Sequence, residues 1–590
     1  MKRALAMALG AMMVAGSAAP ASAASQIDFS GYYTVYYMND VNLSKRNDNF
    51  REWDRVNGVE GDRGTMTDSF WAHRLNIDLV FRATDEISVH WRLRAPTFKR
   101  FGSSGYSDND GQRRTGMVTH HVYGQIDQDW GTLRVGQIDD GFDSYGLGSL
   151  GYAPATDPMW TFVSPFDAGG RIEGVRYNNK WDNGFGLTAQ YQKVDNNNQG
   201  DTAWNEFRQS NNRWSDQDFD RFIVEGTYEW DGGGAALGFR YDRDAAVWAD
   251  GVVNKYQRGD FDKTNAWYIN PAIMHSWGDF SVHFEGMVGW AETEVWAKQS
   301  AVPGLRGERD LDEEGYAFFL DADYNYGPGN VTLAGWWASG TDLGDGYGPE
   351  GDSRWDAGRY DKSKSLVSID QGNFYPLLVA FNGSSSGWGR ESDNAVAIAN
   401  NAFNFVDAGM NRVDFVNDPN GLFLAESGLL ASVNVDGNGI GVPGGISTSR
   451  RNMIHSYNNG SGSANHWAIN LSGNHAFTDD ISMHYALAYM ALNNPNYRVL
   501  SGGTVDMVNG VTGSRFTDQD KDLGFEVDLG FSFQLLDNLS FVTSFGYMFS
   551  GDAYKSLRGY SYNSNTTEFK AVWDDADDSY VWYNTLTFSF

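Results

Sequence analysis

Alternation of apolar and polar residues with a period of two constrains this chain more than any other feature. Within residues 71–82, Leu75, Ile77 and Leu79 share one parity, whereas Asn76 lies on the other. Successive side chains of a β-strand point to opposite faces of the sheet, so this segment is predicted to be a strand with one apolar and one polar face. A chain built from such segments is an all-β protein.

The same alternation recurs along most of the sequence. We predict 18 strands, at residues 27–37, 71–82, 87–94, 117–129, 131–138, 171–181, 184–193, 220–231, 235–242, 265–277, 279–293, 315–326, 329–339, 465–477, 480–493, 522–535, 538–550 and 579–590. At roughly 10 to 14 residues, most of them are longer than the five or six residues usual in globular sheets, and they match the ~9 to 11 that a tilted strand needs to cross a bilayer.

The connections between these segments alternate between short and long. Turns of a few residues, such as 84–85 and 536–537, alternate with loops rich in Gly, Asn and Asp. The long loops are predicted at residues 39–69, 97–116, 139–170, 194–219, 243–264, 294–314, 340–464, 494–521 and 551–578. Short periplasmic turns and long extracellular loops characterise transmembrane barrels, which must close because lipid offers no partner to an open strand edge. We therefore predict a transmembrane antiparallel β-barrel of about 18 strands, with 16 or 20 as alternatives.

Two segments at the ends of this scheme have separate roles. Residues 1–23 combine Lys2 and Arg3, an apolar run and a small-residue cleavage site, so they are predicted to be a secretory signal peptide, and residues 24–590 the barrel. Residues 340–464 are too long for a structureless loop in a compact domain and are predicted to form a long extracellular loop or cap. A further strand pair hidden in this segment would give the 20-strand alternative.

The composition excludes several classes of protein. The mean hydropathy is -0.48, and no run of roughly 20 apolar residues follows the N-terminal segment, which argues against a bundle of membrane helices. The chain has no cysteine, so disulfide frameworks, thiolate zinc sites and iron–sulfur clusters are excluded. A formal net charge of -31 argues against a nucleic-acid partner, because phosphates must be neutralised by clustered Lys and Arg.

One hairpin resembles a known family. Residues 121–137 read His-Val-Tyr-Gly-Gln-Ile-Asp-Gln-Asp-Trp-Gly-Thr-Leu-Arg-Val-Gly-Gln, similar to the hairpin of Gram-negative trimeric porins. Residues 171–177 and 183–187 resemble the return hairpin of that family. Gln137 stands where many porins carry Arg, and 18 strands exceed the 16 of general porins, matching sugar- and carboxylate-selective channels instead. Among porins, the chain looks most like those of sulfate-reducing bacteria.

The C-terminus also resembles outer-membrane barrels. Leu586, Phe588 and the terminal Phe590 alternate along the last predicted strand, like the aromatic signal that such barrels present to their assembly machinery. The resemblance implies localisation in the outer membrane of a Gram-negative bacterium and a homotrimer. The implied partners are outer-membrane lipid, lipopolysaccharide and the barrel assembly machinery.

The resemblance also implies where function resides. In porins the third external loop folds into the barrel, here residues 139–170, and an acidic loop facing a basic wall creates a transverse field that orients solutes. The predicted basic wall consists of Arg74, Arg82, Arg92, Arg94, Arg134 and Arg176, and the predicted acidic loop residues are Asp139, Asp140, Asp143, Asp157 and Asp167. The alternative is that the arginines pair with inner carboxylates such as Asp78 and Glu86.

No cofactor is expected, although one acidic run is a weak candidate for structural calcium. Asp518, Asp520 and Asp522 alternate as calcium ligands do. Leu523 occupies the place of the Gly that a calcium loop requires, so solvated loop charge is the preferred interpretation. Divalent ions bridging such loops to lipopolysaccharide are a further alternative.

The sequence thus predicts a porin, a water-filled channel for passive diffusion of ions and small hydrophilic solutes. The alternatives are a channel selective for anionic solutes, or for sugars if Tyr32 and Trp336 form an aromatic path, and, less favoured, a barrel enzyme or an adhesin. No nucleophile elbow, zinc-protease motif or phosphate loop occurs in the chain, so it is not expected to be an enzyme.

Overall fold

The computed structural model describes the strands and the tight turns of the chain. The described residues are 26–41, 67–100, 118–139, 171–196, 218–244, 259–297, 307–339, 362–363, 369–370, 462–463, 466–493, 497–500, 515–518, 521–552, 556–563, 568–574 and 578–590. The predicted signal peptide, residues 1–23, and most of the predicted segment 340–464 lie outside them. No helix in this described part is long and apolar enough to cross a membrane.

Long strands make up most of the described chain. They are β1 (Gln26–Val41), β2 (Thr67–Arg82), β3 (Ile87–Arg100), β4 (Val118–Gln128), β5 (Gly131–Asp139), β6 (Arg171–Lys180), β7 (Phe185–Asn196), β8 (Asp218–Trp230), β9 (Gly233–Asp244), β10 (Gly259–Trp277), β11 (Phe280–Ala297), β12 (Gly307–Asn325), β13 (Gly329–Ala338), β17 (His466–Thr478), β18 (Ile481–Leu492), β21 (Asp522–Leu536), β22 (Leu539–Ser550) and β25 (Ser579–Ser589). Each overlaps one of the strands predicted from alternation, but several run further towards the long connections. β3, β10 and β12 include residues 97–100, 259–264 and 307–314, where the prediction of loops is wrong.

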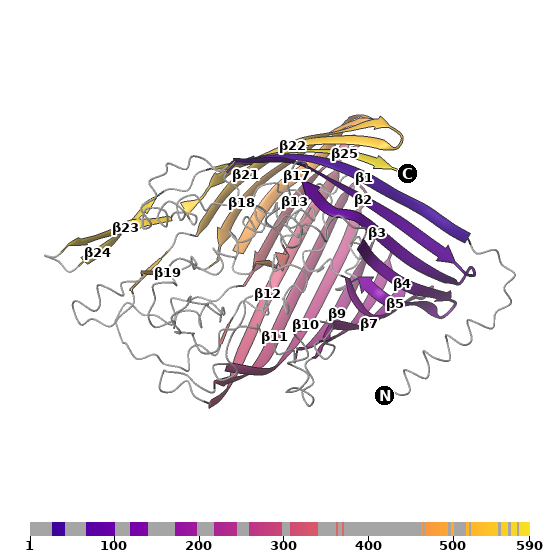
Figure 1. Cartoon of the computed structure of the whole chain (residues 1–590), viewed down its shortest axis with the longest axis horizontal. Helices are drawn as coiled ribbons and strands as arrows, with labels where there is room; N and C mark the ends of the chain where they lie inside the picture. The colour runs from indigo at the N-terminus through magenta and orange to yellow at the C-terminus, as the bar shows by residue number, and fades with distance from the viewer. Residues whose placement is uncertain are drawn as a thin grey trace.

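These strands form one closed antiparallel barrel (Figure 1). The sheet counts 19 strands, of which β14 (Lys362–Ser363) has two residues, so the wall has 18. Every strand pairs with its neighbours in the order of the chain, and β1 pairs with β25, which closes the sheet. Since β13 pairs directly with β17, no strand from the segment between them enters the wall, and the 16- and 20-strand alternatives are wrong.

The two ends of the barrel differ in their connections. Eight tight turns lie at one end, called the turn end here, at residues 83–86, 129–130, 181–184, 231–232, 278–279, 326–328, 479–480 and 537–538. Long connections lie at the other end, called the loop end. Gly184 and Gly232 have φ values of 86° and 78°, which L-residues with a side chain rarely adopt, so glycine suits these two turns.

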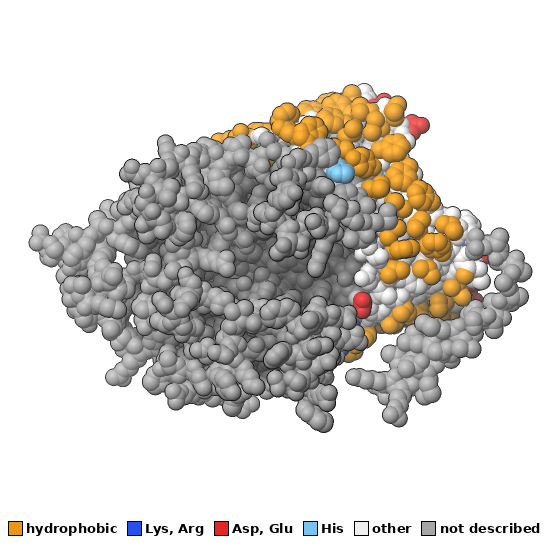
Figure 2. Space-filling view, in the orientation of Figure 1, with side chains coloured by type: hydrophobic (Ala, Val, Ile, Leu, Met, Phe, Trp, Pro, Cys, Tyr) orange, Lys and Arg blue, Asp and Glu red, His pale blue; other side chains and the backbone are white. Residues whose placement is uncertain are grey.

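The outer face of the barrel is an apolar belt. Leu237, Leu333 and Ile469 expose more than half of their side chains on this face. Orange apolar side chains cover the visible wall in Figure 2, with few charges among them. Such a belt is stable against lipid and not against water, so the barrel spans a membrane. This is the build of a Gram-negative outer-membrane protein, the predicted localisation.

Aromatic side chains border the belt at both ends. Towards the loop end, Tyr191, Phe222, Tyr241, Trp267 and Trp290 on five successive strands form a row with ring centroids 5.1 to 6.3 Å apart. Towards the turn end a second row consists of Phe185, Tyr228, Trp230, His275, Trp277 and Phe280. Amphipathic rings favour the interface between lipid and water, so the two rows mark the limits of the hydrocarbon layer.

The inner face is polar and largely buried. Its buried polar residues include Thr34, Asn76, Ser88, Thr188, Gln190, Gln192, Asn270, His283, Thr332, Asn470, Ser472, His484, Ser544, Thr585 and Thr587. Glu526 and Asp528 on β21 are buried on this face, whereas the flanking Phe525 and Leu529 are exposed on the outer one. The predicted division of each strand into a polar and an apolar face is confirmed, with the polar face inward and the apolar face outward.

The terminal residue closes the barrel. Phe590 and Gly31 exchange two backbone hydrogen bonds of 3.0 Å each. The Phe590 ring stacks on Phe29 at 5.6 Å and lies so close to Gly31 that a Cβ there would approach its Cζ atom to 2.8 Å. The predicted assembly signal is therefore also a structural contact between the first and the last strand.

Short strands outside the wall mark the longest connections. β14 pairs in parallel with the loop end of β12, and β15 (Ile369–Asp370) pairs with β16 (Gly462–Ser463). Two further hairpins join β19 (Tyr497–Leu500) to β20 (Arg515–Asp518) and β23 (Ser556–Asn563) to β24 (Glu568–Asp574). The β15–β16 pairing brings the two ends of residues 371–461 together.

Candidate functional site

Basic side chains gather on the inner face of strands β5 to β9. Strand register places Arg134 opposite Arg176 and Arg176 opposite Gln190. The same row continues to Arg240 on β9, which lies opposite Tyr268 on β10. Residues paired across antiparallel strands share one face, so the guanidinium groups of Arg134, Arg176 and Arg240 face the interior of the barrel.

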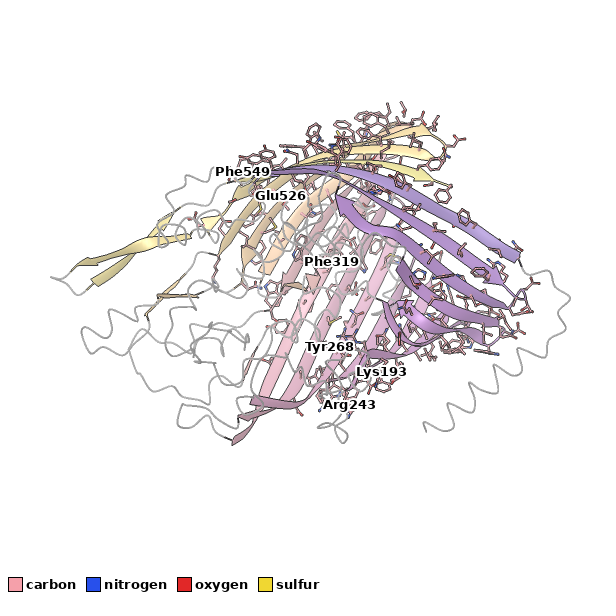
Figure 3. All side chains as sticks on the ribbon, viewed as in Figure 1. Lys193, Arg243, Tyr268, Phe319, Glu526 and Phe549 are labelled. Carbon is pink, nitrogen blue, oxygen red and sulfur yellow. The ribbon has the colours of Figure 1, made fainter. Side chains whose placement is uncertain are left out.

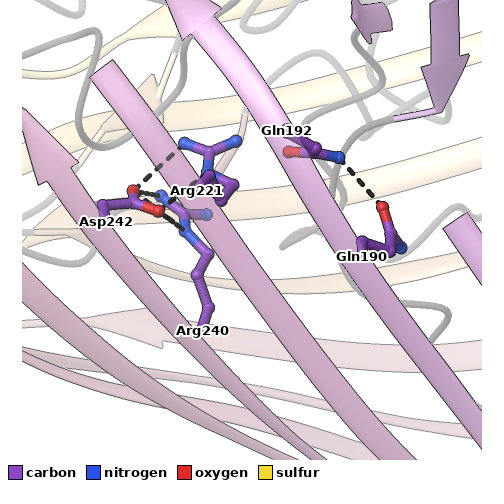
Figure 4. A network of polar contacts seen from close by, with 5 residues as sticks. All are labelled: Gln190, Gln192, Arg221, Arg240 and Asp242. Carbon is purple, nitrogen blue, oxygen red and sulfur yellow. Dashed lines mark hydrogen bonds and ion pairs between the residues drawn. The ribbon is translucent and has the colours of Figure 1, made fainter. Parts of the chain in front are cut away.

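The next row towards the loop end holds a buried ion network (Figure 4). The Asp242 carboxylate accepts hydrogen bonds from Arg221 Nε and Nη2 at 2.8 and 3.1 Å. Arg240 Nη2 donates to the same carboxylate at 2.7 Å, and its guanidinium lies 4.4 Å from the centre of the Tyr268 ring. Arg221, Arg240 and Asp242 are all buried. Figure 3 labels Tyr268 on the wall that carries this network.

Positive charge predominates on these two rows. Arg134, Arg176, Arg221 and Arg240 supply four guanidinium groups, and Asp242 is the one carboxylate on these two rows of the described strands β5 to β9. A planar guanidinium offers several donors in fixed geometry, which suits carboxylate and phosphate groups. Chemically, an excess of guanidinium groups on these rows favours anionic over cationic groups as neighbours.

The structure places each arginine of the predicted basic wall on a barrel strand. Arg134 donates to Gln125 Oε1 at 2.9 Å, and Arg176 donates to Asn178 Oδ1 at 2.9 Å. Both lie on the inner face. Only these two belong to the basic rows described above.

Two predicted wall residues form ion pairs, as the alternative interpretation expects. Arg92 donates to Asp78 in a bidentate pair, at 2.5 Å from Nε and 3.0 Å from Nη2. Arg82 pairs with Asp28 at 2.9 Å beside the 83–86 turn, where both side chains are exposed. Cross-strand register creates both pairs, since Asp78 lies opposite Arg92 and the ends of β1 and β2 meet at Arg82.

The remaining predicted residues are located only in part. Arg74 lies opposite Thr34, and Arg94 opposite Asn76, both at inner register positions, but their side chains are outside the described set. Asp139, opposite Arg171, alternates with the inner position of Ile138. The side chain of Asp139 and the whole of Asp140, Asp143, Asp157 and Asp167 lie outside the described residues.

The buried network was missed by sequence reasoning. Arg221, Arg240 and Asp242 fall within predicted strands 220–231 and 235–242, on the polar parity, alternating with Phe222, Phe239 and Tyr241. Parity alone therefore could have located them. What parity cannot show is that Arg221 and Asp242 lie directly opposite each other, because this depends on the register of β8 against β9.

The weak calcium candidates are not brought together among the described residues. Asp522 Oδ1 accepts a hydrogen bond from the Gly524 amide at 3.0 Å, a local turn contact. Asp518 ends β20 with its side chain undescribed, and Asp520 lies outside the described residues. In the part of the chain that is described, no group of three or more His, Asp or Glu side chains is arranged to hold a metal ion.

Tyr32 and Trp336, the residues proposed for an aromatic sugar path, both lie buried on the inner face. They belong to β1 and β13, which are not neighbours in the wall. The two rings therefore do not form one continuous row along adjacent strands.

Comparison with known proteins gives structural likeness alone. No protein-family model and no curated protein matches the chain. The outer-membrane protein OmpT of Vibrio cholerae, described in a trimer form, is similar at 10% identity, over 96% of this chain and 100% of its own, with a TM-score of 0.32. OccK11 (OpdR) of Pseudomonas aeruginosa is 8% identical, over 96% of each chain, with a TM-score of 0.40. OpdK of the same organism, solved with vanillate, is 9% identical, over 96% of this chain and 98% of its own, with a TM-score of 0.39. The architecture of this chain is established by its own closed strand pairing.

Proposed function

We propose that this protein is an outer-membrane porin, a water-filled channel for passive diffusion of ions and small hydrophilic solutes. The observation that carries the proposal is the distribution of side chains, which is the reverse of that in a soluble barrel. The outer face is an apolar belt, and the inner face is lined with charged and amide side chains. A polar lining provides hydrogen-bond partners for hydrated solutes and excludes apolar ones.

The proposed channel prefers anions to cations. Arg134, Arg176, Arg221 and Arg240 concentrate positive charge on one side of the inner wall, and within a narrow polar passage such charge raises the local concentration of anions. The predicted constriction by residues 139–170 and their acidic side chains belongs to the same proposal.

Ion selectivity in planar bilayers tests both statements. Purified protein is expected to form conducting pores, and the reversal potential in a salt gradient is expected to report anion preference. The double variant Arg134→Gln/Arg176→Gln removes two inner charges and is expected to shift the reversal potential towards cations. The control is Arg243→Gln. Arg243 alternates with the inner residue Asp242, so this substitution removes one positive charge from the outer face instead of the inner one.

The outcomes separate the two parts of the proposal. Folded protein that gives no conductance contradicts a porin. Conductance with equal selectivity in the inner double variant and the Arg243 control contradicts the arginine wall while leaving the channel in place.

A channel selective for anionic solutes is the second candidate. The buried group of Arg221, Arg240 and Asp242 favours it, because two guanidinium groups held by one carboxylate keep donors in fixed positions for a further anion. A selective channel is expected to show saturable block of its current by a small carboxylate such as benzoate and none by a neutral sugar of similar size. Equal, non-saturating passage of both favours the general porin.

The proposed assembly is a homotrimer in contact with lipopolysaccharide, inserted by the barrel assembly machinery. The porin-like hairpin at residues 121–137 supports this proposal, and the likeness to porins of sulfate-reducing bacteria stays a prediction of the same hairpin. The mass of the detergent-solubilised native complex tests it, since a trimer has three times the mass of the mature chain. A monomeric mass under conditions that preserve conductance contradicts the trimer.

A further inference from the structure

A carboxylate without a hydrogen-bond partner among the described residues is buried in the wall beside the arginines. Glu225 lies on the inner face of β8, and its side chain is 0% exposed. Neither of its carboxylate oxygens has a hydrogen-bond partner in the described part of the chain. Burying an ionised carboxylate in this way is costly unless some group of opposite charge accompanies it.

A second oxygen acceptor without a partner lies on the same row. Glu225 is opposite Gly238 on β9, and Gly238 is opposite Asn270 on β10. Because glycine has no side chain, β9 contributes no side chain between Glu225 and Asn270 on this row. Asn270 is 0% exposed, and its Oδ1 atom has no hydrogen-bond partner among the described residues.

Glu285 on β11 completes the group. Asn270 Nδ2 donates to Glu285 Oε1 at 3.1 Å and to the backbone oxygen of Gly286 at 2.6 Å. These two acceptors fix the orientation of the amide, so Oδ1 is the atom left for a ligand. Glu285 is also 0% exposed.

The charge of the group is not balanced by a direct ion pair on Glu225. Glu285 and Arg176 are the charged side chains that act on Glu225, one repelling and one attracting it. Since both oxygens of Glu225 lack a hydrogen-bond partner, the two carboxylates do not share a proton through a direct hydrogen bond. The arrangement is a set of buried carboxylate and amide oxygens on neighbouring strands.

We propose that Glu225, Asn270 and Glu285 hold a hard cation, Ca²⁺ in the first instance, in the inner wall of the barrel. Calcium takes carboxylate and amide oxygens as ligands at about 2.3 to 2.6 Å and completes its shell of six to eight with water. Glu225 supplies two oxygens, Asn270 one and Glu285 at least one. Soft ligands are absent from this group, which disfavours copper and iron–sulfur chemistry.

Occupancy of the site would set the charge of the wall, an effect that rests on the proposed channel function. Without the cation, the carboxylates of Glu225 and Glu285 oppose the charge of Arg176 and its neighbours. With Ca²⁺ bound they are neutralised, and the arginines dominate. Calcium therefore increases anion preference.

Binding is tested on detergent-solubilised protein, independently of conductance. The probe is Tb³⁺, which occupies calcium sites and is excited through a nearby aromatic ring. Tyr268, two residues from Asn270 on the same face, is the expected sensitiser. Wild-type protein is expected to show one saturable luminescent site that Ca²⁺ displaces, and Glu225→Gln/Glu285→Gln is expected to lose it. Asn270→Ala is expected to weaken Tb³⁺ affinity roughly 10-fold, since affinity follows the number and charge of the ligands.

Two controls make the outcome decisive. Glu292→Gln makes the same substitution on the exposed outer side of β11, and Glu526→Gln makes it at a buried inner position on β21. Both are expected to retain the site. Equal Tb³⁺ binding by the Glu225/Glu285 double variant and by these controls overturns the proposal, because the signal then comes from other carboxylates.

Thermal stability supplies an independent measurement. Calcium is expected to raise the melting temperature of the wild-type protein and to leave that of the double variant unchanged. In EDTA the double variant is expected to melt at a higher temperature than the wild type, because the repulsion between the two buried carboxylates is gone. A wild-type protein that is as stable in EDTA as in Ca²⁺ overturns the proposal. Ion selectivity is measured last. If Tb³⁺ binds but Ca²⁺ does not change the reversal potential, only the proposed effect of the cation on ion selectivity is contradicted.

Discussion

At the scale of single residues, the inner wall is held by charges that satisfy one another. Asp242 accepts hydrogen bonds from both Arg221 and Arg240, and all three side chains are almost completely buried. A buried carboxylate between two guanidinium groups is tolerable because each charge keeps donors and acceptors around it. The same three residues therefore contribute both to the packing of this wall and to its charge.

Replacing Asp242 by Asn is therefore expected to be costly. The substitution keeps the shape of the side chain but leaves two buried guanidinium groups without their counter-charge, and removing one partner of a buried ion pair costs about 3 kcal/mol or more. The measurement is the free energy of unfolding in urea after insertion into lipid vesicles. The same variant is expected to become more anion-selective.

Asp28→Asn provides the comparison. Asp28 pairs with Arg82 through an equally short contact, but both side chains are about half exposed to solvent. Exposed ion pairs contribute little, so this variant is expected to unfold like the wild type. If Asp242→Asn is no less stable than Asp28→Asn, burial does not control the strength of these pairs.

At the scale of the strand, each residue of β9 belongs to one of two environments. Gly238, Arg240 and Asp242 face inward, whereas Leu237 and Phe239 contact lipid. Leu237 lies between the two aromatic rows, opposite Gly226 on one neighbour and Pro271 on the other. This places it near the centre of the hydrocarbon layer.

An arginine at position 237 is thus expected to cost about 2 to 4 kcal/mol, the range measured for basic residues at the bilayer centre of such barrels. Leu536→Arg is the matched control: Leu536 is at least as exposed as Leu237 but lies beside the 537–538 turn, where the same change costs about 0 to 1 kcal/mol. If Leu237→Arg and Leu536→Arg lose the same free energy of unfolding, the cost of a buried charge does not depend on depth in the membrane as expected.

Alternation predicted the strands well because it is a local property. Each of the wall strands, from β1 to β25, and the orientation of residues such as Glu526 and Leu529 could be predicted from parity alone. The partners of charged residues could not be, because Arg92 meets Asp78, and Arg221 meets Asp242, through register between separate strands. Glu225 and Asn270 were missed for the same reason: their relation depends on Gly238 lying between them.

At the scale of the whole molecule, closure joins the first and the last strand of the wall. β1 and β25 pair along Tyr32 to Val41, and Phe590 adds the last two hydrogen bonds of the seam. A barrel has no free edge only if this seam forms, so contacts there affect all of the strands together.

Phe590→Ala is expected to lower both the yield of folded barrel and the temperature at which it unfolds, as seen by heat-dependent migration on gels. The variant loses the contacts of the ring with Phe29 and Phe588 at the seam. Phe477→Ala removes a comparably exposed ring near the 479–480 turn, away from the seam. Equal effects of the two substitutions would contradict a special role for the C-terminal residue.

The pairing of β15 with β16 separates the longest connection, residues 371–461, from the strands of the wall. The two ends of residues 371–461 are held together by the pairing of β15 with β16. The wall strands β13 and β17, on either side of this connection in the sequence, are hydrogen-bonded directly to each other. Lengthening a connection whose ends are fixed costs little, about 0.6 kcal/mol for each doubling. Changes in the length or sequence of residues 371–461 therefore leave the strand register of the wall unchanged. The connection and the wall can evolve at different rates.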